Sequence, residues 1–145
     1  MIRCKNLSFS YPEGAFELNV DSFQVQSQEQ VAVVGSSGSG KTTLLYLMAG
    51  IYATNRGSVT INDIELSQYS ETDRQDFRIA SLGLVFQEFA LLEYLSVLDN
   101  VLLPYRINPV LTLSSGEKDL ALQLLSATGL IEKKDRYPHQ LSQGE

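Results

Sequence analysis

A glycine-rich stretch, GSSGSGKT at residues 35–42, constrains the fold of this 145-residue chain more than any other feature. It matches the pattern G-x-x-x-x-G-K-[ST], in which a tight loop joins a buried strand to the start of a helix. Both neighbours are present: VAVV at 31–34 is a continuous apolar run, typical of a strand covered on both faces, and LLYLMA at 44–49 favours a helix. The stretch therefore predicts an α/β fold built on a strand–loop–helix unit.

The residue types of this loop suit the binding of a polyphosphate. Glycines let successive backbone N–H groups turn toward an anion, and the free N–H groups at the start of the helix face the same way. In this pattern Lys41 reaches the β- and γ-phosphates, and the Thr42 hydroxyl ligates Mg²⁺. Chance alone gives such a match in roughly one chain of this length in two hundred. The expected nucleotide-binding residues of the loop are Gly35, Ser36, Ser37, Gly38, Ser39, Gly40, Lys41 and Thr42, although the serines could serve only as spacers.

Several short segments outside the loop read as strands. Residues 2–11 and 17–25 alternate loosely between apolar and polar side chains, and the turn-prone sequence Pro-Glu-Gly separates them, so we expect an antiparallel pair. SVTI at 58–61 is a further short strand. LGLVF at 82–86 is a continuous apolar run like 31–34, and we expect a second strand that is buried on both faces.

Helices are expected where serines stand three residues before an acidic side chain, the spacing of a capping box. Ser70 with Asp73 predicts a polar helix over about 71–79, and Ser114 with Glu117 predicts a second helix that ends near Gly129. We interpret residues 1–95 as a core with an antiparallel β layer and 96–145 as a helical subdomain. The apolar face of the second helix is expected at Leu120, Leu124 and Ala127.

The composition and net charge limit the classes of protein to which the chain can belong. Hydrophobic residues make up 43% of the chain, which is typical of a globular domain, and the net charge of −6 argues against a nucleic-acid partner held by phosphate contacts. The sequence shows neither a signal peptide nor an apolar stretch of membrane-spanning length, so we expect a cytoplasmic protein. Cys4 lies in an alternating segment and is expected to be a buried thiol.

Four features in a fixed order resemble the ATP-binding subunit of ABC (ATP-binding cassette) transporters. Tyr11 stands where that family places an aromatic side chain that stacks on adenine, and residues 35–43 match its Walker A loop, which adds Thr43 to the nucleotide contacts. Gln87 stands at the position of the Q-loop glutamine, which contacts Mg²⁺ and the attacking water. LSQGE at the end of the chain resembles the LSGGQ signature, with Ser142 and Gly144 matching.

The resemblance implies a P-loop nucleoside triphosphatase core that binds ATP with Mg²⁺, forms a head-to-tail dimer around two ATP molecules and drives a transmembrane permease from the inner face of the cell membrane. FQEFALLEYLSVLDNVLLPY is similar to the branch of lipoprotein-releasing and macrolide-export cassettes. No apolar run leads into Asp-Glu, the Walker B pattern that holds Mg²⁺ and supplies the general base. We therefore expect LSQGE to be an interrupted signature and the chain to be the N-terminal part of a longer cassette.

Other interpretations of the same residues stay open. Tyr11 is compatible with an ordinary strand aromatic, Gln87 with a solvated residue after a strand, and Ser142 with a helix N-cap. Gln143 and Glu145 depart from the signature, and a carboxylate beside a phosphate site is expected to face away. The alternatives for the whole chain are a non-transport ABC-type ATPase and a nucleotide-binding module without hydrolysis. A GTPase is disfavoured because the sequence has no N-K-x-D guanine-binding motif.

Overall fold

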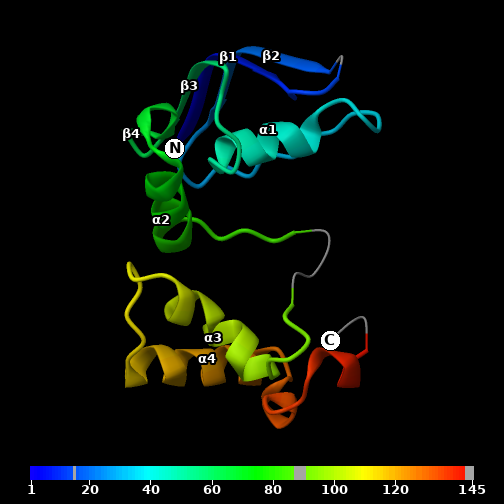
Figure 1. The fold of residues 1–145 in the computed structure, drawn as a ribbon, viewed down its shortest axis with the longest axis vertical. Helices are drawn as coiled ribbons and strands as arrows, with labels where there is room; N and C mark the ends of the chain where they lie inside the picture. Colours follow the sequence, from blue (N-terminus) through cyan, green and yellow to red (C-terminus); the bar gives the residue numbers. More distant parts are fainter. Residues whose placement is uncertain (15, 87–90, 143–145) are drawn as a thin grey trace. The chain divides into compact units, whose positions relative to one another are not determined.

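The computed structural model describes residues 1–14, 16–86 and 91–142 of the chain. These residues form two compact units, Met1–Leu82 and Gly83–Glu145 (Figure 1). The first carries the strands and the glycine-rich loop, and the second is helical. None of the helices in the described residues is long and apolar enough to cross a membrane.

The first unit is built on a four-stranded antiparallel sheet in the order β2-β1-β3-β4. β1 (Ile2–Ser10) pairs with β2 (Glu17–Val25) on one side and with β3 (Arg56–Ile61) on the other, and β4 (Ile64–Glu65) forms one edge. The strands expected at 2–11, 17–25 and 58–61 are confirmed, and so is the antiparallel pairing of the first two.

A bulge in β1 shifts the alternation of its side chains. Cys4 and Leu7 lie three residues apart, yet both are buried, because the register with β3 shifts between Lys5 and Ser8 and Asn6 adopts a positive φ of 46°. On the partner strand, Gly57 has a φ of 81°, and a Cβ built there would lie 2.2 Å from the Asn6 carbonyl oxygen. Only glycine fits this position.

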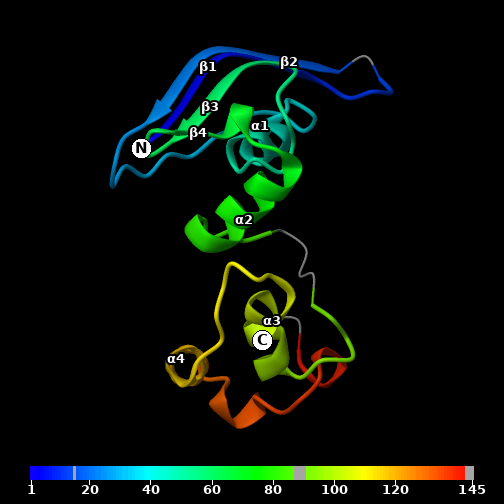
Figure 2. The ribbon, with the colours of Figure 1, turned by 60° about the vertical axis from the view of Figure 1, so that its left-hand side comes forward.

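The core of the first unit lies between the sheet and α1 (Lys41–Met48), which covers one sheet face (Figure 2). Burial raises the pKa of the Cys4 thiol to about 11, so the thiol is protonated at neutral pH, which agrees with the expected buried cysteine. The buried residues of this core are Cys4, Leu7, Phe9, Leu44, Leu47, Met48, Val59, Ile61 and Leu66.

The carboxyl end of α1 is closed by a glycine and by two arginines. Gly50 takes a φ of 66°, its N–H bonds the Leu47 carbonyl and the next N–H bonds Tyr46, which is the Schellman arrangement. α2 (Glu71–Ser81) follows η1 (Leu66–Gln68) and begins with the expected capping box. From α2, Arg74 Nε and Arg78 Nη1 both donate to the Gly50 carbonyl oxygen, at 3.1 and 2.5 Å.

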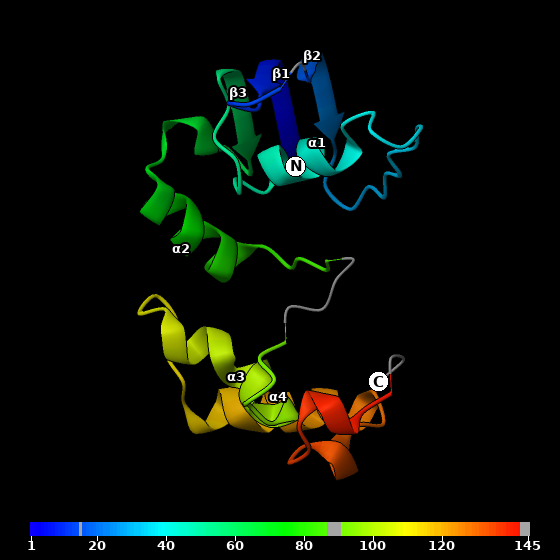
Figure 3. The same cartoon turned by 45° about the vertical axis from the view of Figure 1, so that its right-hand side comes forward.

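The second unit pairs α3 (Val97–Ile107) with α4 (Ser115–Ala127), which lie side by side (Figure 3). The predicted capping box of Ser114 and Glu117 is present, and Gly129 ends α4 with a φ of 73° and a Schellman pair of hydrogen bonds. Two short 3₁₀ turns, η2 (Ile131–Lys133) and η3 (Pro138–Gln140), lead to the end of the chain.

The predicted apolar face of α4 is wrong by one residue. Leu120 and Leu124 are 50% and 55% exposed, whereas Ala121 and Leu125 are buried. α4 carries apolar residues over a wide arc, so its periodicity alone does not fix which part of the arc packs against α3.

The two strands predicted to be buried on both faces are also wrong. Residues 31–34 and 82–86 are extended without strand pairing, and their side chains are largely exposed, with Val34 at 86% and Val85 at 97%. A strand of this kind exists only where neighbouring strands bond both of its edges. No described residue supplies such a neighbour to either segment. The apolar runs therefore identify segments suited to burial without specifying what covers them.

Candidate nucleotide-binding site

The glycine-rich loop ends on an uncapped helix. α2, α3 and α4 each follow an N-cap serine whose hydroxyl accepts a backbone N–H, whereas the N-cap of α1 is Gly40, which has no side chain, and the first turn of α1 has no acidic residue. Gly40 adopts a left-handed φ of 91°, and Gly38 a φ of 77°. The first N–H groups of α1 are thus left for a ligand, and the helix dipole favours an anion there.

Two glycines of the loop lie where a Cβ would approach neighbouring side chains too closely. A Cβ at Gly40 would lie 2.8 Å from the Phe16 ring, and a Cβ at Gly35 would lie 2.9 Å from Ser39 Oγ. Any side chain at Gly40 would therefore meet both a steric clash and an unfavourable backbone conformation. A hollow of about 330 Å³ borders this loop, lined by Leu18, Val33, Val34, Gly35, Ser36, Ser39, Gly40, Lys41 and Leu44.

The Lys41 side chain is hydrogen-bonded to the backbone of the glycine-rich loop. Its Nζ donates to the carbonyl oxygens of Gly35 and Ser36, at 2.9 and 2.7 Å. The ammonium group is therefore held at the mouth of the loop, with both contacts made to neutral acceptors. Exchange of these carbonyls for phosphate oxygens would convert neutral acceptors into charged ones, which form stronger hydrogen bonds with an ammonium.

Tyr11 joins the end of β1 to α1. Its hydroxyl lies 2.9 Å from Oγ1 of Thr43, a residue that is 7% exposed. Three rings surround the tyrosine: the Phe9 centroid lies at 4.9 Å and that of Tyr52 at 5.9 Å, both edge to face, and that of Phe16 at 5.8 Å. Burial, and next the neighbouring Tyr11, raise the pKa of Tyr52.

Sequence reasoning missed this aromatic cluster around Tyr11. Phe16 lies in the connection between β1 and β2, Tyr46 lies in α1, and Tyr52 lies in the segment after α1. Only the fold brings these rings together. No local sequence signal links these rings, because residues 25–34 before the loop contain no aromatic side chain and residues 49–58 after the helix contain only Tyr52.

The structure brings together some of the predicted site residues and leaves others apart. Residues 35–43 and Tyr11 meet in the first unit. Ser142 is an exposed residue of the second unit, just after η3. Gln87 and Gly144 lie outside the described residues, as do Gln143 and Glu145. The roles assigned to all of these residues remain predictions.

Comparison with known families decides the assignment of the chain. The family model described as ABC transporter matches residues 18–145. The chain belongs to the ABC transporter family. This confirms the resemblance drawn from the Walker A loop, the Q-loop position and the signature, and the ABC assignment applies to both units because the match runs through them.

Curated relatives of this ABC protein are 37–38% identical to it over the aligned residues. An uncharacterised ABC transporter ATP-binding protein of Mycobacterium tuberculosis is 37% identical over 148 aligned residues, covering 100% of this chain and 59% of the relative. The lipoprotein-releasing system ATP-binding protein LolD of Idiomarina loihiensis is 38% identical, covering 100% of this chain and 64% of the relative. The bacitracin export ATP-binding protein BceA of Halalkalibacterium halodurans is 38% identical, covering 84% and 47%.

Solved structures agree with this placement. The ATP-binding cassette MJ0796, solved as a dimer in a post-hydrolysis state with ADP and Pi, superposes with a TM-score of 0.83 at 28% identity, covering 98% of this chain and 63% of MJ0796. A second dimeric structure of MJ0796 gives a TM-score of 0.84 at 29% identity. The fold class expected from the sequence is thus confirmed, and the chain spans about three fifths of the length of this cassette.

Proposed function

We propose that this chain is the nucleotide-binding part of an ABC transporter ATPase and that it binds Mg-ATP at residues 35–43. The observation that carries the proposal is the uncapped amino end of α1, which follows a glycine-rich loop whose last glycine, Gly40, has a left-handed backbone and no room for a Cβ. The family membership and the MJ0796 cassette solved with ADP and Pi support a nucleotide as the anion.

Each residue has a distinct task in this proposal. The backbone N–H groups of the loop and of the first turn of α1 bind phosphate oxygens, and Lys41 supplies a charge to the β- and γ-phosphates. Mg²⁺ would be held by Thr42 and Gln87, where it would neutralise charge on the transferring phosphoryl group. Tyr11 would stack on adenine. Ser142 and Gly144 would contact the γ-phosphate of the ATP bound to a second subunit.

The partners follow from the family. We propose a head-to-tail dimer around two ATP molecules, which the dimeric MJ0796 structures support, and a transmembrane permease as the driven partner, which the names of LolD and BceA support. In this arrangement the chain sits at the cytoplasmic face of the membrane through the permease. We also propose that the 145-residue chain alone does not turn over ATP, because its sequence contains no apolar run into Asp-Glu.

A calorimetric titration with Mg-ATP tests the nucleotide site. Lys41→Ala removes the charged contact and should weaken binding by at least about tenfold, since a hydrogen bond to a charged group contributes about 1.5–3 kcal/mol. Lys118→Ala is the matched control, because Lys118 is an exposed lysine of α4 in the other unit. Equal ATP affinity in the wild type and Lys41→Ala would refute the assignment.

Phosphate release under the same conditions tests the second part of the proposal. We expect release no faster than background for the 145-residue chain. Turnover that is lost in Lys41→Ala but retained in Lys118→Ala would show that a catalytic base lies within these residues, and the non-hydrolysing interpretation would be wrong.

A further inference from the structure

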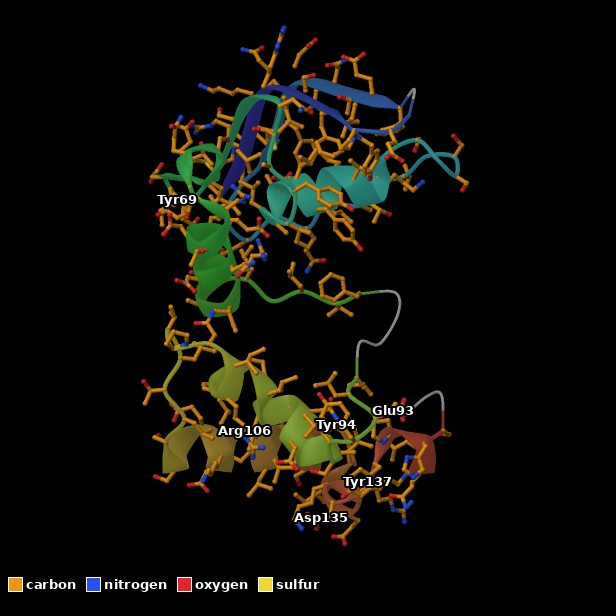
Figure 4. The ribbon with its side chains drawn as sticks, in the orientation of Figure 1. Tyr69, Glu93, Tyr94, Arg106, Asp135 and Tyr137 are labelled. Atoms are coloured by element: carbon orange, nitrogen blue, oxygen red, sulfur yellow. The ribbon has the colours of Figure 1, made fainter. Side chains whose placement is uncertain are left out.

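The first turn of α3 is hydrogen-bonded to two segments, each of which lies beside a different motif in the sequence. On one side lies 91–96, which follows the Q-loop position along the chain. On the other lies 134–136, which leads through η3 to LSQGE. Figure 4 shows these two segments next to each other in the second unit, with Tyr94 labelled on the first and Tyr137 just after the second.

Asn100 makes the contacts on the first side. Its Oδ1 accepts a hydrogen bond from the Leu92 N–H at 2.8 Å, and its Nδ2 lies 3.1 Å from the Leu92 and Leu95 carbonyl oxygens and 3.0 Å from that of Ser96. One half-buried amide thus pairs with the backbone on both sides of the turn before α3. An amide group has both a donor and an acceptor, and here the turn uses both.

Backbone amides make the contacts on the other side. The first N–H groups of α3 have no partner within the helix, and they are not left to water: Val97 N donates to the Arg136 carbonyl at 2.8 Å, and Leu98 N donates to that of Lys134 at 2.9 Å. Ser96 caps the following N–H, that of Asp99, at 3.1 Å. The amino end of α3 therefore holds the segment before LSQGE by its own backbone.

We infer that Asn100 is a positioning residue, which fixes the turn at 92–96 on α3 so that the Q-loop side and the signature side of this unit move as one body. The inference rests on the proposed function for its consequence in ATP binding, but its structural part stands without it. Loss of the Asn100 amide would free the 92–96 turn first. The bonds from Val97 and Leu98 to 134–136 would then weaken, because the turn that orients these two N–H groups is no longer held.

Amide hydrogen exchange on the whole chain, read residue by residue, tests the structural part. In Asn100→Ala, the Leu92, Val97 and Leu98 amides should exchange at least about tenfold faster, while the Gly129 and Leu130 amides at the end of α4 should be unchanged. An acceleration spread evenly over the second unit would indicate a general loss of stability and would overturn the inference, and so would an unchanged Leu92.

Two further variants separate the hydrogen bonds from the shape of the side chain. Asn100→Asp keeps the acceptor for Leu92 N–H but turns a carboxylate toward three carbonyl oxygens, so it should be at least as damaging as Asn100→Ala. Asn108→Ala is the matched control, because its Oδ1 accepts from Val110 N–H at the other end of the same helix. Near-normal exchange in Asn100→Asp would mean that side-chain volume, and not the amide, holds the turn.

Addition of Mg-ATP tests the functional part. In the wild type, the exchange of Leu92 and Arg136 should change together, whereas in Asn100→Ala only Leu92 should respond. The same response at both residues in Asn100→Ala would refute the coupling, as would no response at either residue in a wild type that binds ATP. A wild type that binds no ATP in calorimetry would instead refute the proposed function, and the exchange pattern without nucleotide would still decide the role of Asn100.

Discussion

Tyr11 offers two contacts whose effects can be separated, its ring face and its hydroxyl. The hydroxyl bonds Thr43 at 2.9 Å, and a net contribution of about 0.5–1.5 kcal/mol is usual for such a hydrogen bond. Tyr11→Phe leaves the Thr43 hydroxyl without this partner at a site that is only 7% exposed, so we expect a loss of about 1–2 kcal/mol in the free energy of unfolding of the first unit.

A double-mutant cycle measures this contact. Thr43→Val removes the second hydroxyl at nearly constant volume, and the tyrosine hydroxyl, which is half-buried, then bonds water. In the double variant neither hydroxyl of this pair remains, and any effect of Tyr11→Phe on Tyr52 is common to both variants that carry it. We therefore expect the sum of the losses in the two single variants, measured as free energy of unfolding, to exceed the loss in the double variant by about 1 kcal/mol. This difference is larger than the error of such cycles. Amide exchange of β1, measured as a function of urea concentration, gives the free energy of unfolding of the first unit separately from that of the second.

Mg-ATP affinity of the same variants tests the ring face. Base stacking contributes about 1–3 kcal/mol, so Tyr11→Ala should weaken binding by roughly fivefold or more, whereas Tyr11→Phe should keep affinity within about twofold. If Tyr11→Phe is as damaging to affinity as Tyr11→Ala, the hydroxyl and not the ring serves the nucleotide. In the double-mutant cycle, a loss of stability in the double variant equal to the sum of the two single losses would show that the Tyr11–Thr43 contact contributes nothing to folding.

Two further predictions concern stability. Gly57→Ala should destabilise the first unit by several kcal/mol, because its Cβ would overlap the Asn6 carbonyl and its φ of 81° disfavours any side chain; a thermal midpoint within about 1 °C of the wild type would contradict this. In the second unit, the Ser96 hydroxyl and then the paired Arg106 lower the pKa of Asp99. The stability contributed by Asp99 should therefore be present above about pH 4 and lost as the pH falls below it, so that the thermal midpoints of wild type and Asp99→Asn converge at acid pH.

Local chemistry explains which elements could be predicted from the sequence. Ser70 with Asp73 and Ser114 with Glu117 set the starts of α2 and α4 through bonds within one turn, and Gly129 ends α4 by its own backbone conformation. Each of these signals acts over four residues or fewer. These local signals can be identified in the sequence because they do not depend on contacts with distant parts of the chain.

The errors all depend on contacts that are distant in the sequence. Residues 31–34 and 82–86 carry the apolar pattern of central strands, but whether they pair depends on segments elsewhere. The one-residue error on α4 has the same origin, because α3 decides which part of a wide apolar arc is buried. In the site, the loop was predictable from its glycines, whereas the bond from Tyr11 to Thr43 spans 32 residues and needed the fold.

The two arginines that contact Gly50 have a consequence for the opposite end of α1. The carboxyl end of a helix carries partial negative charge, and here Arg74 and Arg78 place two guanidinium groups on it, close enough that burial and the charge of Arg74 lower the pKa of Arg78. With that pole neutralised and no acid in the first turn, the positive pole at Gly40 is left uncompensated. α2 therefore raises the electrostatic potential at the proposed phosphate site, which lies at the other end of α1, an eight-residue helix about 12 Å long.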